Sequence, residues 1–189
     1  TPHLAMSGLW ESWVSVFLIT LIRPGWRWAD IGANVGYYSL LFHDLTHGGQ
    51  GYAWEPNPPI HECLRDTFNV NGCKATLYQA AFGPPPPVPH ESGTTIFTLH
   101  ASKRYTGGSS LYKTEYVQGD TSTTQVRLMT ELPDVEVLKI DAEGHDLPIV
   151  LSLQNPPPHI ILEYVTGYGH IAALTPAMFD KYEVQEIRS

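Results

Sequence analysis

The stretch that decides the fold is Trp28-Ala-Asp-Ile-Gly-Ala-Asn-Val-Gly-Tyr-Tyr-Ser39, in which a buried strand runs into a glycine-containing turn. An apolar helical face follows this turn and consists of Tyr37, Tyr38, Leu40, Leu41, Phe42 and Leu45. Gly32 permits a tight turn, Gly36 permits close approach of the next helix, and Asn34 tolerates a positive φ. We therefore expect backbone N–H groups and a helix N-terminus at the carboxyl edge of a sheet, where open α/β sheets bind ligands.

Strands and helices alternate around this turn. The sequence predicts strands at residues 26–31, 52–54, 75–82, 135–140 and 160–165, with amphipathic helices in the connections. This order predicts an α/β fold, with a doubly wound, mostly parallel sheet and helices on both faces. The apolar segment at residues 13–22 is about half the length of a membrane span and no basic region precedes it. We expect it to be a buried helix packed on the sheet.

The 189 residues correspond to a single domain. An insertion at about residues 83–133 interrupts the alternation and begins with the run Pro84-Pro85-Pro86-Pro87. Residues 94–99 and 125–129 within it have strand character. Insertions of this kind often form a lid or a substrate wall, and the alternative is a flexible loop with no part in the site. The start at Thr1 without Met and the short C-terminus leave room for further sequence at either end.

The net charge and the cysteine content limit which partners and which cellular compartment are expected. Nineteen acidic residues against eleven basic ones give a net charge of −8, which repels a phosphate backbone and argues against nucleic acid as a partner. Cys63 and Cys73 form neither a disulfide framework nor a CxxC site, so a reducing, cytoplasmic location is expected. A homo-oligomer is compatible with this composition.

Glu55 ends the second predicted strand, 19 residues after Gly36, where a carboxylate can accept both hydroxyls of a ribose. The turn reads G-A-N-V-G and lacks the middle glycine of the G-x-G-x-x-G fingerprint, which lets a pyrophosphate approach the backbone. Asp30, at the mouth of the turn, suits an amino group or a cation better than a pyrophosphate. Together these residues favour S-adenosylmethionine over a nicotinamide cofactor. A nicotinamide-dependent oxidoreductase and a catalytically silent S-adenosylmethionine-binding module remain as alternatives.

Several motifs carry a family resemblance. They are residues 28–39, Trp54-Glu-Pro-Asn-Pro58, Gly108-Ser-Ser-Leu111, Leu138-Lys-Ile-Asp-Ala-Glu-Gly-His-Asp146 and Ile161-Leu-Glu-Tyr164. With these motifs the chain resembles the FkbM-type S-adenosylmethionine-dependent methyltransferases over about residues 18–164. The resemblance implies a class I methyltransferase (Rossmann-like) fold and O-methylation of a hydroxyl on a small molecule, natural product or glycan. The proline-rich residues 83–90 and the short C-terminus depart from the family pattern.

The candidate site residues lie at the ends of the predicted strands. The predicted cofactor-binding residues are Asp30, Gly32, Ala33, Asn34, Gly36, Tyr37, Ser39, Glu55, Pro56, Asn57, Ala81, Phe82, Ser110 and Asp141. The predicted catalytic residues are Asp141, Glu143, His145 and Glu163. An alcohol acceptor needs a base, and His145 has the natural pKa for one. Asp141, Glu143 and Glu163 could instead hold a divalent cation, an alternative that we do not favour.

Overall fold

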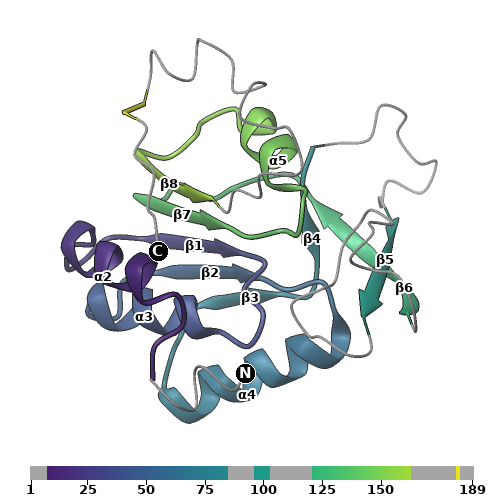
Figure 1. The fold of residues 1–189 in the computed structure, drawn as a ribbon, viewed down its shortest axis with the longest axis horizontal. Helices are drawn as coiled ribbons and strands as arrows, with labels where there is room; N and C mark the ends of the chain where they lie inside the picture. Colours follow the sequence, from purple (N-terminus) through teal and green to yellow (C-terminus); the bar gives the residue numbers. More distant parts are fainter. Residues whose placement is uncertain (1–7, 85–95, 103–120, 163–181, 184–189) are drawn as a thin grey trace.

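The structure is a computed structural model that describes residues 8–84, 96–102, 121–162 and 182–183. Its larger sheet has five strands in the order β3-β2-β1-β7-β8, and every neighbouring pair is parallel (Figure 1). The strands are β1 (Trp28–Ile31), β2 (Gly51–Trp54), β3 (Thr76–Tyr78), β7 (Val137–Ile140) and β8 (His159–Leu162). Their order reverses at β1, so the two halves of the sheet diverge from β1 and β7. This confirms the predicted parallel α/β sheet.

Helices cover both faces of this sheet. Its helices are α2 (Ser12–Leu21), α3 (Tyr37–Leu45), α4 (Pro58–Asn71) and α5 (Asp146–Ser152). Phe42 of α3 and Leu64 of α4 pack in one buried cluster with Trp28 and Val137 of the sheet. Ile149 of α5 belongs to a second cluster on the opposite face. Helices on both faces are therefore confirmed.

Strand β1 contributes to both clusters because successive side chains in a strand point to opposite faces. Trp28 packs with α3 on one face, whereas Ala29 and Ile31 pack with α5 on the other. Strand β7 repeats the pattern, since Val137 joins the first cluster while Leu138 and Ile140 join the second. Both strands therefore form the centre of the core, and their carboxyl ends lie next to each other.

Helix α2 is only partly buried, which corrects the expectation of a buried helix at residues 13–22. Leu18 and Ser15 are fully buried, but Trp13, Val16 and Ile19 are 40%, 55% and 53% exposed. The helix packs by one side alone, against α3, because it lies outside the strand–helix repeats of the sheet. Among the described residues, no helix combines the length and apolarity needed to cross a membrane.

A second, smaller sheet explains the irregular middle of the sequence. It contains β4 (Ala81–Phe82), β5 (Ile96–Ser102) and β6 (Thr121–Met129), in the order β4-β6-β5. The single strand predicted at residues 75–82 is therefore wrong: β3 pairs with β2, and β4 pairs in parallel with β6 instead. Strands β5 and β6 form an antiparallel pair inside the predicted insertion. The insertion is thus tied to the fold through main-chain pairing.

Candidate active site

The glycine turn after β1 sits directly against the end of β7. The φ of Gly32 is +79°, and a Cβ on this residue would lie 1.9 Å from the carbonyl oxygen of Asp141. The N–H groups of Gly32 and Ala33 both donate to the carbonyl of Trp54, 3.0 Å away, which fastens the turn to the end of β2. Only a glycine allows three chain segments to meet this closely. The carboxyl ends of β1, β2 and β7 therefore form one compact edge.

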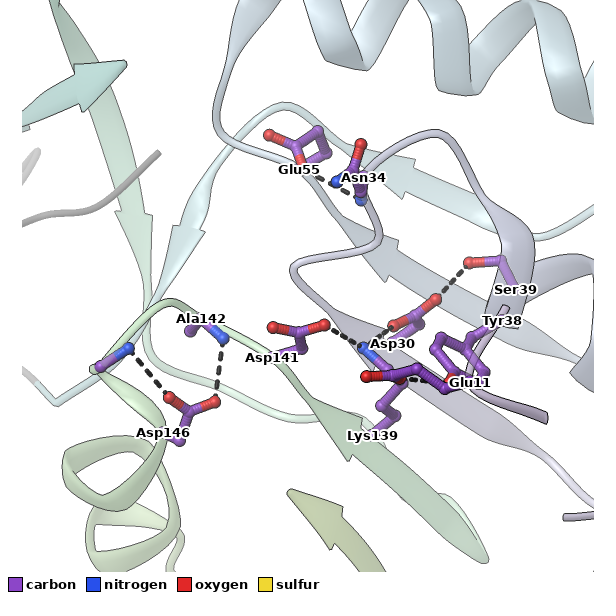
Figure 2. A network of polar contacts seen from close by, with 11 residues as sticks. Glu11, Asp30, Asn34, Tyr38, Ser39, Glu55, Lys139, Asp141, Ala142 and Asp146 are labelled. Atoms are coloured by element: carbon purple, nitrogen blue, oxygen red, sulfur yellow. Dashed lines mark hydrogen bonds and ion pairs between the residues drawn. The ribbon is translucent and has the colours of Figure 1, made fainter. Parts of the chain in front are cut away.

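Glu55 lies beside this turn, immediately after β2. Its two carboxylate oxygens accept one backbone hydrogen bond each, from Asn57 N at 2.8 Å and from Asn34 N at 3.0 Å. Figure 2 shows the contact with Asn34. Asn34 has the predicted positive φ, 50°, and this conformation aims its N–H at the carboxylate. The side chain of Glu55 is almost fully buried, and burial raises its pKa to about 7. Burial and two backbone donors thus hold the Glu55 carboxylate in one place at the sheet edge.

These residues fit the ribose of a nucleoside cofactor. Each Glu55 oxygen accepts one backbone hydrogen bond and can accept a second one. The two oxygens together can therefore accept from both hydroxyls of a ribose. The side-chain oxygen of Asn34 is buried and has no hydrogen-bond partner among the described residues, so it offers a further acceptor. Pro56 and Asn57 continue the same loop into α4, and their contact with a cofactor stays a prediction.

A second group of charged residues lies on the face of β1 and β7 that α3 covers. Asp30 and Lys139 are register partners on the two strands, and both are buried (Figure 2). The ammonium of Lys139 lies 3.1 Å from Oδ2 of Asp141 and 3.8 Å from Oδ1 of Asp30. Ser39 of α3 donates a hydrogen bond of 2.6 Å to the other Asp30 oxygen. Burial raises the pKa of Asp30, while the charge of Lys139 lowers it.

Asp30 and Ser39 therefore have partners within the chain. We had expected a ligand cation beside Asp30, and the cation that the structure brings there is Lys139. Neither side chain has any exposed surface. A direct contact of these two residues with a cofactor stays a prediction, and their observed role is to support Lys139.

The loop after β7 presents the other predicted catalytic residues. Asp141 is partly exposed at the sheet edge, and Glu143 adopts a left-handed φ of 49°. His145 is the first residue of the turn into α5 and makes no capping hydrogen bond with its side chain. It approaches β4, since a Cβ on Gly83 would lie 2.9 Å from Nε2 of His145. Burial lowers the pKa of His145, so its imidazole is neutral near pH 7.

Asp146, for which the sequence predicts no role, holds this loop in shape. Its carboxylate accepts hydrogen bonds from Ala142 N at 2.9 Å and Gly144 N at 3.1 Å (Figure 2). An acidic residue in the first turn of a predicted helix was the signal for this role. The other residues that were missed are Lys139, Tyr38 and Glu11. A lysine inside the otherwise apolar strand Val137–Ile140 was the available signal, because a buried lysine needs charged partners.

The remaining predicted residues pack within the chain or fall outside the described residues. Tyr37 shares a hydrogen bond of 2.9 Å with Ser15 of α2, so its hydroxyl ties two helices together. Ala81 and Phe82 are buried in β4, where the Phe82 ring meets Trp54 edge-on at 5.3 Å between centroids. Ser110 and Glu163 fall outside the described residues. Among the residues that are described, no group of three or more His, Cys, Asp or Glu side chains is arranged to hold a metal ion.

Comparison with known proteins gives a family and a fold. A family model for the methyltransferase FkbM domain matches residues 30–179. No curated protein matches the chain in sequence. Among solved structures, a precorrin-6y C5,15-methyltransferase from Geobacter metallireducens GS-15 aligns with a TM-score of 0.50 and 17% identity, over 85% of this chain and 64% of that one.

The YcgJ protein from Bacillus subtilis aligns with a TM-score of 0.38 and 12% identity, over 69% of this chain and 38% of that one. The chain therefore covers less than two thirds of the length of both of these solved structures. The parallel sheet, the glycine turn and the match over most of the sequence agree, and the chain belongs to the methyltransferase FkbM domain family.

Proposed function

We propose that this protein is an S-adenosylmethionine-dependent methyltransferase that O-methylates a hydroxyl of a small molecule, natural product or glycan. The observation that carries the proposal is Glu55, a buried carboxylate that two backbone N–H groups hold beside the glycine turn. The chain belongs to a methyltransferase family, and S-adenosylmethionine, the methyl donor proposed here, has a ribose but no phosphate. Glu55 can bind the ribose. Asn34 stands in place of the middle glycine that a pyrophosphate needs, which agrees with a cofactor that has no phosphate.

S-adenosylmethionine supplies, when it is bound, an electrophilic methyl group on a sulfonium that leaves as a neutral thioether. The chain's own residues then have three tasks: to hold the ribose, to align the acceptor oxygen with the methyl group, and to remove the hydroxyl proton. Glu55 and Asn34 serve the first task. Asp141, at the end of β7, serves the second, since its backbone carbonyl lies against the glycine turn and its carboxylate is partly exposed at the same edge.

His145 is the proposed base. Its imidazole is neutral near pH 7 because burial lowers its pKa, so it can accept the proton that the hydroxyl loses. It lies in the loop after β7, four residues beyond Asp141, and a Cβ on Gly83, the residue after β4, would lie 2.9 Å from its Nε2. Glu143 and Glu163 remain candidates for orienting the acceptor.

The proposal does not invoke a metal ion bound by Asp141, Glu143 and Glu163. The Asp141 carboxylate already meets a cation of the chain itself, the Lys139 ammonium at 3.1 Å. A nicotinamide-dependent oxidoreductase is disfavoured by the turn, in which Asn34 replaces the glycine that a pyrophosphate needs. The net charge of −8 supports an uncharged or cationic acceptor over a nucleic acid.

Titration calorimetry with S-adenosylhomocysteine tests the cofactor assignment. We expect binding by the wild-type protein and none with NAD⁺ at the same concentration. Glu55→Ala should weaken S-adenosylhomocysteine binding by about 100-fold, since a charge-assisted pair of hydrogen bonds contributes about 3 kcal/mol.

The matched control is Glu62→Ala, which removes an exposed carboxylate from α4 and should leave binding unchanged. Normal binding by Glu55→Ala would contradict the ribose assignment. Binding of NAD⁺ in place of S-adenosylhomocysteine would favour the oxidoreductase.

A further inference from the structure

The charged residues behind the proposed site form a chain that runs from the core to the sheet edge. Asp30 and Lys139 are opposite each other in the β1–β7 register. Asp141 lies two residues after Lys139, directly after the end of β7. Because side chains two apart in a strand share a face, Lys139 and Asp141 point to the same side. The Lys139 ammonium is the group that touches both carboxylates, at 3.8 Å and 3.1 Å.

Aromatic and acidic side chains enclose the Lys139 ammonium on its remaining side. It lies 4.7 Å above the centre of the Tyr38 ring, a cation–π distance. The Tyr38 hydroxyl in turn donates a hydrogen bond of 2.5 Å to Glu11, the residue before α2 (Figure 2). The two acidic partners raise the pKa of Lys139 although its burial opposes them, so the side chain stays charged.

A buried lysine is costly, and this one is placed where an apolar residue would otherwise continue the strand. Its charge has a consequence for Asp141. Without a cation between them, the Asp30 and Asp141 carboxylates would repel each other. Among the described residues, Lys139 is the partner that fixes the direction of the Asp141 side chain. The ammonium lies between the two carboxylates and sets the direction of the partly exposed one, that of Asp141.

On the basis of the proposed function, we propose that Lys139 is a positioning residue: it holds the Asp141 carboxylate toward the methyl-bearing end of the cofactor, and Asp30 and Tyr38 hold Lys139. Asp141 is the group that meets the cofactor, and Lys139 acts only through it. A negative charge held there favours S-adenosylmethionine, which carries a sulfonium, over S-adenosylhomocysteine, in which that charge is absent. The ratio of the two affinities therefore reports the direction of the Asp141 carboxylate.

The test compares these two affinities by calorimetry in four proteins: the wild type, Asp141→Asn, the double variant Asp30→Asn/Lys139→Met, and the triple variant that combines all three changes. The double variant removes the buried cation and its buried counter-ion together, so no unpaired charge is left in the core and folding is preserved. Lys74→Met, which removes an exposed lysine before β3, is the matched control and should keep the wild-type ratio.

We expect Asp141→Asn to reduce the preference for S-adenosylmethionine by about tenfold, and the double variant to cause most of that loss. The triple variant should equal Asp141→Asn alone, because Lys139 has no effect once Asp141 carries no charge. A merely structural role for Lys139 would weaken both ligands equally and leave the ratio unchanged.

A double variant with the wild-type ratio, beside an Asp141→Asn variant that has lost it, would overturn the positioning role while the proposed function stands. A wild type that binds neither ligand would instead overturn the proposed function and, with it, this inference.

Discussion

Glu55 combines two properties that pull its protonation in opposite directions. Burial raises its pKa to about 7, and the negative charges of Asp30 and Asp141 add to that effect. The two backbone N–H groups of Asn34 and Asn57 oppose it, because they donate to the ionised form. The carboxyl group therefore titrates near neutral pH, where an exposed glutamate would be fully ionised.

This titration predicts a pH dependence of cofactor binding. Below pH 7 the ligand-free protein holds Glu55 mostly protonated, and a proton occupies an acceptor position that the ribose needs. The affinity for S-adenosylhomocysteine should therefore rise with pH, by up to about tenfold per unit between pH 5.5 and 7, and level off above pH 7.5. Calorimetry at five pH values measures this profile.

Glu55→Gln is the control for that profile, because its amide does not titrate. It should bind more weakly, with an affinity that no longer changes between pH 5.5 and 7.5. If Glu55→Gln kept the wild-type rise, the titrating group would lie elsewhere, and His145 would be the first to test.

At the scale of single residues, local chemistry could be predicted and partners could not. The positive φ of Asn34 and the tight turn at Gly32 follow from residue types and short spacing, and both are confirmed. The cation beside Asp30 is a side chain of the chain itself, Lys139, which lies 109 residues further along the sequence, whereas the predicted contact of Asp30 with a ligand cation stays a prediction. The register that pairs them depends on how β1 and β7 align, which a single sequence does not encode locally.

Among the elements, the turn between β1 and α3 is the connection that tolerates least change. We predict that Gly32→Ala lowers the free energy of unfolding by about 3 kcal/mol or more, because the added Cβ meets a backbone carbonyl that cannot move aside. Chemical denaturation measures this loss.

Gly25→Ala separates the collision from the backbone conformation. Gly25 has nearly the same φ, +83°, but open space where its Cβ would be. This control should lower the free energy of unfolding by only about 1 kcal/mol, because alanine is disfavoured in a left-handed conformation. Equal losses in the two variants would show that the contact with Asp141 contributes nothing.

The order of strands could be predicted where strands that are consecutive in the sequence pair with each other. The prediction was wrong where a strand pairs with a distant segment. Strands β1, β2 and β3 follow one another as neighbours, so the strand–helix alternation was enough to place them. Residues 75–82 read as one apolar strand, yet the chain leaves β2 after Tyr78 and pairs Ala81 with Leu128 of β6. That partner lies 47 residues away, beyond any local pattern.

For the whole molecule, the described residues divide into a five-stranded sheet covered by helices and a three-stranded sheet beside it (Figure 1). Glu55, Asp141 and the glycine turn all belong to the larger sheet, and His145 faces the junction with the smaller one through Gly83. The predicted cofactor residues at the ends of β1, β2 and β7 thus belong to the larger sheet, whereas β5 and β6 of the smaller sheet come from the predicted insertion.

The membership of β1 in both buried clusters has a consequence for the order in which the molecule opens. The amides of Trp28 to Ile31 can reach solvent only when the clusters on both faces come apart, which amounts to unfolding the whole sheet. Native-state hydrogen exchange should therefore show these amides to be the slowest, with β7 close behind. Amides of β5 and β6 should exchange through partial opening, since only a small buried cluster around Leu99, Val126 and Leu128 covers them. Equal protection in β1 and β6 would mean that the two sheets open together as one cooperative unit.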